Sequence, residues 1–404
     1  MDFTTGDRVL LTDRAGIELY MCLYTQYDTL TYGLEVVNHN DFPVYVKGSD
    51  MYINGNTYCP YGALGYTVVE PNATSDRIPI SFDVPEDLCF PDGLSSLQFT
   101  LNVENALNCI NILHDQILRI GLHDPTPLNP YGYWSEYTAF TRPTRSILAP
   151  EQGLLETEDL RITLLGLGGN PENTGLWGGI CMENLSDETL YLEPYGASFD
   201  GIFMDIHGSS VDIPPHCKVY EDLSIDAEEL DRSAITSARE ISLLFQTKEF
   251  LAISGGGGFA QQFALPVTLT HSGTPAKLPE GSRVLFEEDG VRITYLFQET
   301  SGNSYSWYIT VTNTTDRYLS LDMTDTVING TALENSEYGG QSIFDSELGP
   351  HQSRIARISF IGNERSLESL AFRFQIMDFN GETILYTGTT PITILPEPVP
   401  EADS

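Results

Sequence analysis

The sequence contains few basic residues. Its 404 residues include 20 lysines and arginines against 57 aspartates and glutamates, which gives a formal net charge of −37. Because the approach of such a chain to phosphate groups would be repulsive, this balance argues against binding to nucleic acid or to an anionic membrane surface. It favours solubility, or partners that are cationic.

Long apolar runs are also missing. No stretch reaches the roughly 18 apolar residues that a membrane-spanning helix needs. The first residues, MDFTTGDRVLL, lack the basic-then-apolar order of a signal peptide. We therefore expect no membrane insertion within this chain.

The sequence lacks the common motifs of catalysis and ligand binding. It has no GxSxG, HExxH or SxxK pattern, no CxxC or Cys/His zinc spacing, and no Dx[DN]xDG calcium loop. The glycine-rich stretch SGGGGFA (254–260) is not followed by GK[ST] and lies between predicted strands, so it is expected to be a flexible hairpin loop rather than a phosphate site. GLGG (166–169) fails as a dinucleotide-binding fingerprint for the same reason. We expect no enzyme activity, no cofactor and no metal site.

Three alternatives to that expectation remain open. Abundant carboxylates could supply the acid pair of a glycosidase, although they are spread over turns. The oxygens of a repeated Asn/Asp turn, described next, could bind Ca²⁺. A hairpin could bring together four transition-metal ligand types that lie within thirteen residues, namely Asp205, His207, His216 and Cys217.

What the sequence does contain is one motif written three times. An Asn is followed three residues later by Asp and seventeen residues later by Gly, in the sets Asn38–Asp41–Gly55, Asn184–Asp187–Gly201 and Asn313–Asp316–Gly330. Similar segments flank each set in the same order. The recurrence indicates an internal repeat of about 115–120 residues, which is the size of one domain.

The repeat and the changes in composition together predict the domain organisation. We expect repeat 1 at 1–122, an aromatic and Pro-rich linker at 123–151, repeat 2 at 152–270, a short linker at 271–281, repeat 3 at 282–396 and an acidic tail at 397–404. The six cysteines are unevenly divided among them: Cys22, Cys59, Cys89 and Cys109 fall in repeat 1, and Cys181 and Cys217 in repeat 2. A disulfide that the fold requires should recur in every copy, so we interpret them mostly as free thiols, with an incidental bridge inside repeat 1 or 2 as the alternative.

Each repeat is predicted to consist of β-strands. Apolar residues alternate with other residues before each motif Asn, as in Leu34 and Val36, and again in a later strand, as in Leu97, Phe99 and Leu101. This period of two indicates strands with one buried face, and two such sheets must cover one another in a β-sandwich. Just before the later strand, VPEDLCFPDGLSSL, DAEELDRSAITSARE and GNERSLESL are predicted to be short helical crossovers.

Turn chemistry explains why the motif recurs. The Asn can accept a backbone N–H two residues on, as an Asx turn, and we expect the Asp to help close the reversal. The Asn-Gly or Asp-Gly pairs at 54–55, 200–201 and 329–330 supply the positive φ angles of two-residue type I′ hairpins.

The motif and the domain size resemble immunoglobulin-like modules of bacterial cell-surface proteins and lipoproteins, especially those of Gram-positive gut anaerobes. The resemblance covers nearly the whole chain and rests on the N-x-x-D turn, the [ND]-G hairpin and the repeat length. It implies three tandem immunoglobulin-like β-sandwich domains. It also implies an extracellular or cell-envelope location, with any leader or anchor outside this chain.

The sequence therefore favours a non-enzymatic spacer or partner-binding protein. The alternative is a carbohydrate-binding or accessory module of a polysaccharide-processing system. The candidate contacts for a protein or glycan partner are the aromatic residues of the first linker, because clustered aromatics on an irregular segment can stack on sugar rings or anchor a partner. These residues are Tyr131, Tyr133, Trp134, Tyr137 and Phe140, and packing between repeats 1 and 2 is their other possible role.

Overall fold

The structure is a computed structural model that describes residues 8–26, 29–59, 67–80, 94–126, 147–169, 175–233, 235, 237–248, 259–281, 283–301, 304–332, 345–361, 369–378, 384–387 and 392–394. Nearly all regular structure in these residues is β-strand, and the helix among them, α2, spans Ala227–Arg232. The strands form several sheets. The predicted all-β, multi-domain sandwich fold is confirmed.

The chain divides into two compact units. The first comprises Met1–Glu193 and Gly208–Leu223, and the second comprises Pro194–His207 and Ser224–Ser404. The division passes through repeat 2, so each unit contains strands of two neighbouring repeats. Each unit is described by itself below.

One sheet of the first unit comes entirely from repeat 1. Its strand order is β1–β2–β3–β7, with β8 also paired to β3. All of its pairs are antiparallel. The strands are β1 (Arg8–Arg14), β2 (Ile17–Gln26), β3 (Thr29–Asn38), β7 (Ala73–Thr74) and β8 (Ile78–Pro79).

The other sheet of this unit contains strands from both repeats. Its order is β10–β9–β4–β5–β18–β14–β13–β11, with β6 paired to β4 and β12 paired to β13. Repeat 1 contributes β4 (Val44–Ile53), β5 (Thr57–Cys59), β6 (Thr67–Val69), β9 (Leu94–Asn105) and β10 (Asn111–Thr126). The remaining strands are β11 (Ile147–Ala149), β12 (Gln152–Glu156), β13 (Leu160–Gly169), β14 (Leu176–Asn184) and β18 (Lys218–Ile225).

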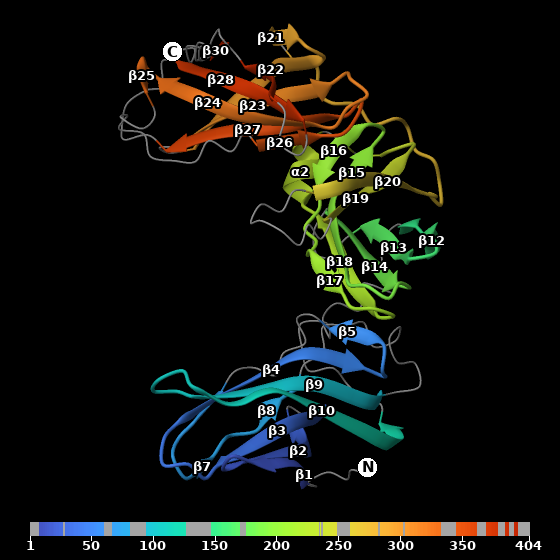
Figure 1. The fold of residues 1–404 in the computed structure, drawn as a ribbon. Coiled ribbons are helices and arrows are strands. Elements are labelled where there is room, and N and C mark those ends of the chain that lie inside the picture. Colours follow the sequence, from blue (N-terminus) through green and yellow to red (C-terminus); the bar gives the residue numbers. More distant parts are fainter. Residues whose placement is uncertain are drawn as a thin grey trace, which may run out of the picture. The chain divides into compact units, whose positions relative to one another are not determined.

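The two sheets of repeat 1 enclose one core. Figure 1 shows β4, β9 and β10 as a layer against β1, β2 and β3. The predicted period of two is confirmed, because Leu34 and Val36 on β3 are buried in this core and Leu97, Phe99 and Leu101 on β9 face them. Burying each such side chain contributes about 1.5–3 kcal/mol to folding.

The second unit also has a sheet that joins two repeats. Its order is β20–β19–β15–β16–β27–β23–β22–β21, and β17 (Val211–Ile213) pairs with Leu190–Leu192 of β15 in the part of that strand that belongs to the first unit. Repeat 2 contributes β15 (Leu190–Phe199), β16 (Ile202–Asp205), β19 (Ile241–Lys248) and β20 (Phe259–Val267). Repeat 3 contributes β21 (Arg283–Glu288), β22 (Val291–Ser301), β23 (Ser304–Asn313) and β27 (Ser353–Ile361).

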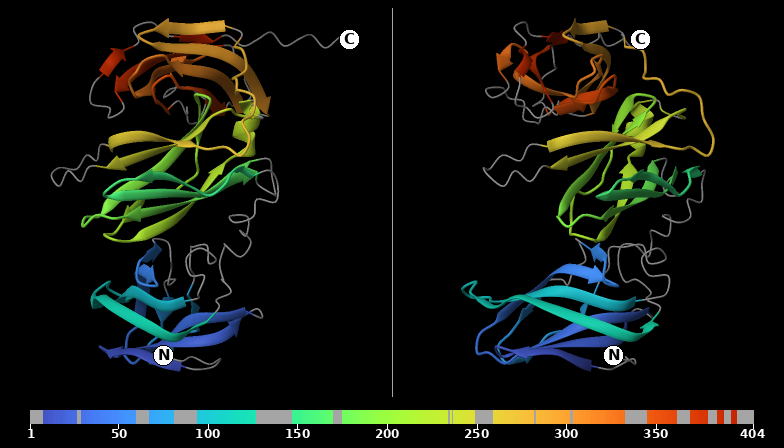
Figure 2. Two further views of the ribbon diagram at one scale, coloured as in Figure 1. Left: turned by 90° about the vertical axis from the view of Figure 1, so that its right-hand side faces the viewer. Right: turned by 45° about the vertical axis from the view of Figure 1, so that its right-hand side comes forward.

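The last sheet comes from repeat 3 alone. Its order is β25–β24–β28–β29, with β26 paired to β24 and β30 to β28. Its strands are β24 (Leu319–Ile328), β25 (Thr331–Ala332), β26 (Asp345–Leu348), β28 (Leu370–Asp378), β29 (Ile384–Thr387) and β30 (Ile392–Ile394). Figure 2 shows the orange and red strands of repeat 3 in two layers, which bury Trp307, Ile309, Phe372 and Phe374 between them.

The Asn-Gly and Asp-Gly pairs form the expected tight turns. Asn54, Asp200 and Asn329 have φ near +50°, at 49°, 50° and 49°, and the following glycines have φ of 88°, 88° and 80°. The predicted two-residue loop is found in repeats 2 and 3, where Phe199 pairs with Ile202 and Ile328 with Thr331. In repeat 1 the prediction is wrong by one residue, because Ile53 pairs with Thr57 and Asn56 also belongs to the loop.

The helix α2 lies in the predicted crossover of repeat 2. It is preceded by Asp226, and Glu228 and Glu229 lie in its first turn, where carboxylates interact favourably with the helix dipole. In repeat 1 the segment from Leu94 onward belongs to strand β9, and residues 81–93 lie outside the described part of the chain. Most of the repeat 3 crossover, 362–368, also lies outside it.

The strands extend into the segment predicted to be the first linker. The β10 strand continues to Thr126, beyond residue 122, because it pairs with β9 as far as Leu94. The short strand β11, at 147–149, pairs with β13 of repeat 2. Both ends of the 123–151 segment therefore belong to strands of the sheet that joins repeats 1 and 2.

Candidate functional site

The repeated Asn forms the predicted Asx turn in all three repeats. Its side-chain Oδ1 accepts the backbone N–H two residues on, at 3.0 Å from Asn40 to Asn38, 2.9 Å from Ser186 to Asn184 and 2.9 Å from Thr315 to Asn313. In repeat 3 the Thr315 hydroxyl also donates to Asn313 Oδ1, at 2.7 Å, and accepts from the Arg317 N–H at 3.2 Å. These bonds close the reversal between β23 and β24.

The same Asn has a second role that the sequence pattern did not predict. In repeat 3, Asn313 Nδ2 donates to the carbonyl oxygens of Arg317 at 2.7 Å, Leu348 at 3.3 Å and Gly349 at 2.9 Å. Asn38 and Asn184 each make three equivalent bonds, at 2.7–3.1 Å. All three Asn side chains are 0% exposed, so the amide ties the turn to the segment before the next strand.

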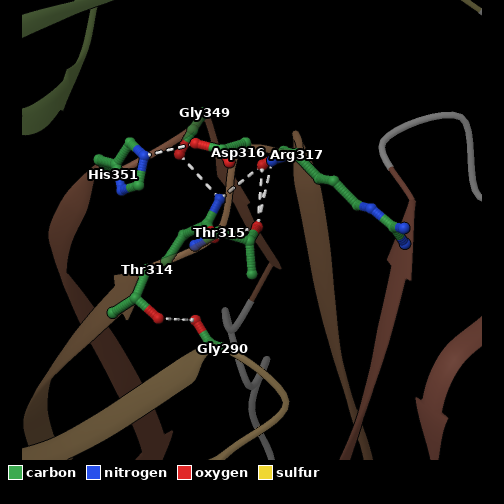
Figure 3. A network of polar contacts seen from close by, with 8 residues as sticks. Gly290, Thr314, Thr315, Asp316, Arg317, Gly349 and His351 are labelled. Carbon is green, nitrogen blue, oxygen red and sulfur yellow. Dashed lines mark hydrogen bonds and ion pairs between the residues drawn. The ribbon is translucent and has the colours of Figure 1, made fainter.

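In repeats 2 and 3 the motif Asp contacts a histidine instead of the turn backbone. Asp187 Oδ1 lies 3.0 Å from His216 Nε2, and Asp316 Oδ1 lies 2.8 Å from His351 Nε2. Figure 3 shows the second pair beside Thr314, whose hydroxyl donates to the Gly290 carbonyl. Both aspartates are almost fully exposed, at 97% and 96%, so these pairs add little to stability. The expectation that the Asp closes the reversal is wrong.

The Asn or Asp of each hairpin also anchors the later strand. Asp200 Oδ1 accepts the Glu240 N–H at 3.1 Å, and its Oδ2 accepts the N–H groups of Arg239 at 2.9 Å and Ala276 at 2.7 Å. Asn54 accepts from Ser95 and Ser96, and Asn329 accepts from Ser369. The sequence signal was present, because all three positions carry a side-chain oxygen.

The hairpin strand of repeat 1 pairs with the next repeat. In the first unit, β5 runs parallel to β18, with Thr57 beside Lys218. The Lys218 N–H donates to the Asn56 carbonyl at 2.9 Å. The second sheet of repeat 1 thereby continues into the first sheet of repeat 2.

Aromatic and aliphatic side chains cover this junction. Tyr220 of repeat 2 is 8% exposed and belongs to the core cluster of repeat 1, with Leu165 and Cys181 packed against that cluster. The rings of Tyr52 and Tyr58 lie 5.1 Å apart. Burial raises the pKa of Tyr58 to about 12 and the pKa of Cys181 to about 11, since it disfavours the charged form of each group.

The hairpin strand of repeat 2 pairs with repeat 3 in the same way. In the second unit, β16 runs parallel to β27 with Ile202 beside Ser353, and the Ser353 N–H donates to the Gly201 carbonyl at 2.9 Å. Arg354 bonds Asp205 at 2.6 Å and stacks 4.9 Å above the Phe203 ring. Phe203 and Leu244 of repeat 2 belong to the core cluster of repeat 3.

The two junctions define the candidate functional site. We call the hairpin strand after each [ND]-G pair the tail edge of its repeat, namely β5, β16 and β25. We call the strand after the Asn-bound loop the head edge, namely β7, β18 and β27. At both junctions the carbonyl of the residue just before the tail edge accepts the N–H of the first residue of the head edge, which is the backbone pairing that strand addition uses.

The aromatic residues predicted as the contact site lie outside the described residues. These are Tyr131, Tyr133, Trp134, Tyr137 and Phe140. The four candidate metal ligands have other contacts: His207 pairs with Asp226, His216 with Asp187, and Asp205 with Arg354, whereas Cys217 is buried. Across the described ranges no three His, Cys, Asp or Glu side chains form a metal-binding group.

The described cysteines agree with the free-thiol interpretation. Cys22, Cys59, Cys109, Cys181 and Cys217, the cysteines of the described residues, form no disulfide, and of these Cys109 is exposed. Cys89 and most of the glycine-rich loop, 251–258, lie outside the described residues. None of the helical structure in the described part of the chain is long and apolar enough to cross a membrane.

Comparisons with known proteins give no family for this chain. A comparison with protein-family models and one with curated proteins each produced no match.

Proposed function

We propose that this chain is a non-enzymatic structural and interaction protein of the cell envelope or the secreted fraction. Its tandem immunoglobulin-like repeats act as spacer and partner-binding modules. The observation that carries the proposal is the recurrence of one edge-to-edge junction, at Asn56–Lys218 and at Gly201–Ser353. Within each compact unit this backbone pairing joins two neighbouring repeats, which suits a spacer.

The motif residues support this role because their polar groups form structural bonds. The amide of each motif Asn is fully buried and bonded to backbone carbonyls, and the hairpin Asp200 accepts three backbone N–H groups. These groups therefore position backbone rather than a substrate. The net charge of −37 favours a soluble, exposed molecule and disfavours nucleic acid as the partner.

Surface labelling of intact cells that produce the protein tests the proposed location. An impermeant amine reagent should label the chain before the cells are broken, because the side chains of Lys47 and Lys277 are exposed. A cytosolic protein labelled only after lysis serves as the control. Labelling of this chain only after lysis would contradict an extracellular or envelope location.

The alternative function is carbohydrate binding, and the linker aromatics Tyr131, Tyr133, Trp134, Tyr137 and Phe140 are the feature that favours it. Titration with soluble polysaccharides should then change tryptophan emission in the parent and not in Trp134→Phe. A matched Trp177→Phe variant should keep the response. Equal changes in emission in the two variants would show that Trp134 of the linker does not contact the glycan.

A further inference from the structure

The strand order shows that both junctions join the same two kinds of half-sheet. The strands that end at a tail edge form the tail half of a repeat, and the strands that begin at a head edge form the head half. The tail half β10–β9–β4–β5 of repeat 1 continues into the head half β18–β14–β13 of repeat 2. The tail half β20–β19–β15–β16 of repeat 2 continues into the head half β27–β23–β22–β21 of repeat 3. Two half-sheets are not part of either junction. They are the head half of repeat 1, β7–β3–β2–β1, and the tail half of repeat 3, β29–β28–β24–β25.

Both remaining halves end in an edge strand. Among the described residues, β7 pairs with β3 and β25 pairs with β24, and no further strand follows either in its sheet. Thr74, Gly330 and Thr331 are exposed at these edges. Unpaired strand edges of this kind are templates for pairing with another chain.

The atoms at these edges match those of the two internal junctions. Lys218 and Ser353, the N–H donors, each follow by two residues a histidine with left-handed backbone, His216 or His351, both with φ of 56°. In repeat 1, Asn72 has the same conformation, with φ of 53°, and Thr74 follows it by two residues. Thr74 therefore occupies the donor position.

The acceptor position is filled at the other end of the chain. Gly201, whose carbonyl accepts at the second junction, is the second residue of the two-residue loop between β15 and β16. Gly330 is the second residue of the equivalent loop between β24 and β25. A junction built in this register would place Thr331 of one edge beside Thr74 of the other, as Ile202 lies beside Ser353.

We propose that the tail edge of repeat 3 pairs with the head edge of repeat 1 in a second copy of this chain. The Thr74 N–H donates to the Gly330 carbonyl and extends the sheet from one copy into the next. Because the two edges differ, the contact is heterologous and joins the copies head to tail. The inference names a partner for the structural role proposed above and rests on it.

This contact is weaker than the internal junctions. Ala332 pairs with Val327 at the position where Tyr58 pairs with Tyr52 in repeat 1 and Phe203 with Ser198 in repeat 2. The free tail edge therefore has a methyl group where both internal junctions have an aromatic ring. The charge of −37 on each copy also opposes association at low ionic strength, so the chain associates at high concentration and in added salt.

Sedimentation velocity of the full chain tests the proposal. The weight-average sedimentation coefficient should rise over about a hundredfold range of concentration, and Thr74→Pro, which removes the donor N–H, should weaken association by about tenfold. Thr74→Val keeps the N–H and the branched shape and should associate like the parent. A parent that stays monomeric, or a Thr74→Pro variant that associates like Thr74→Val, would overturn the proposal.

Disulfide trapping distinguishes the head-to-tail contact from a symmetric one. In a Cys109→Ser background, which removes the exposed cysteine of the described residues, Thr74→Cys and Thr331→Cys are prepared as separate single variants. Oxidation of their mixture should give dimers, while each variant alone should give few. Equal dimer formation by either variant alone, or none in the mixture, would refute the pairing.

The two proposals fail separately. Loss of association between copies leaves the internal junctions in place and does not change the surface labelling that tests the structural role. Labelling only after lysis would contradict the proposed location, whereas concentration-dependent sedimentation would still report the contact between copies.

Discussion

Each motif Asn supplies both an acceptor and two donor hydrogens to a buried position. Its Oδ1 accepts the N–H two residues on, and its Nδ2 donates to three carbonyl oxygens. An aspartate has the same shape and could replace only the acceptor. Buried groups left without a partner are costly, so this position requires an amide.

Replacing this amide should strongly destabilise repeat 3. Asn313→Asp would place a carboxylate against the carbonyls of Arg317, Leu348 and Gly349. We expect the free energy of unfolding to fall by about 3 kcal/mol or more, measured by chemical denaturation. The control Asp316→Asn changes an exposed side chain in the same turn and should stay within about 0.5 kcal/mol of the parent. Similar losses in both variants would contradict the role of the buried amide.

Position 330 requires a glycine because of its backbone conformation, and not because a larger side chain would clash with neighbouring atoms. Its φ is 80°, and a Cβ added there would meet no atom within 4 Å. Gly330→Val should therefore cost about 1–3 kcal/mol through backbone strain alone. Gly153→Val is the matched control, because a Cβ at Gly153 also has free space and that residue lies in β12 without a positive φ. Equal unfolding midpoints for the two variants would remove strain as the explanation.

Tyr58 makes the fold sensitive to alkaline pH. Burial raises its pKa to about 12 from the ordinary value of 10.0, so the folded state holds the phenolic proton more tightly than the unfolded state does. The stability from this group is complete below pH 10 and is lost as the pH rises towards 12. Titration of tyrosinate absorbance should show one late group fewer in Tyr58→Phe than in the parent, and an unchanged titration curve would contradict the assignment.

At the scale of elements, the sequence was most informative where a few neighbouring residues determine the local structure. Alternation at Leu97, Phe99 and Leu101 predicted β9, and the [ND]-G pairs predicted the hairpins, because each depends on a few adjacent residues. The extra loop residue Asn56 was not predictable, since the NGN of repeat 1 fits a two-residue or a three-residue loop equally well. Its effect is that Thr57 pairs with Lys218 of the next repeat, and that Asn56 rather than Gly55 supplies the carbonyl at the junction.

The head and tail edges were not predictable for a different reason. A bond between the Ser353 N–H and the Gly201 carbonyl involves backbone atoms that every residue except proline carries, so no side-chain pattern marks it. The candidate site from sequence was instead the linker aromatics, which are conspicuous in composition. Edge pairing becomes visible only when the strand order of each sheet is known.

Arg354 should contribute more than an exposed arginine. Its side chain is 13% exposed and bonds Asp205 of the preceding repeat at 2.6 Å, whereas Arg373 is 43% exposed and lies 3.2 Å from Asp325. We expect Arg354→Ala to lower the free energy of unfolding of the second unit by about 1–2 kcal/mol and Arg373→Ala by less than about 1 kcal/mol. Denaturant titrations of both variants decide this, and the reverse order would argue against a stabilising junction.

At the scale of the whole molecule, the boundaries of the repeats and those of the compact units differ. The sequence divides the chain by recurrence, whereas the two units divide it within repeat 2, between 193 and 194, between 207 and 208 and between 223 and 224. The physical reason is that sheets continue through the junctions: β5 with β18 in one unit and β16 with β27 in the other. Side chains follow the same division, because Tyr220 belongs to the core cluster of repeat 1 and Phe203 to that of repeat 3.

This continuity predicts how repeat 3 behaves when it is separated from the chain. Residues 282–396 contain their own two-layer core and should unfold cooperatively, but they lose Phe203 and Leu244, which are 3% and 1% exposed in that cluster. Losing one such side chain is worth about 1.5–3 kcal/mol, which lowers the Tm of a domain this size by several degrees. The buried Trp307 is the sole tryptophan of the segment, and Trp134→Phe with Trp177→Phe makes it the sole reporter in the full chain as well. A segment without a cooperative transition would show that repeat 3 is not an independent domain, and an unchanged Tm would show that the junction adds nothing to its stability.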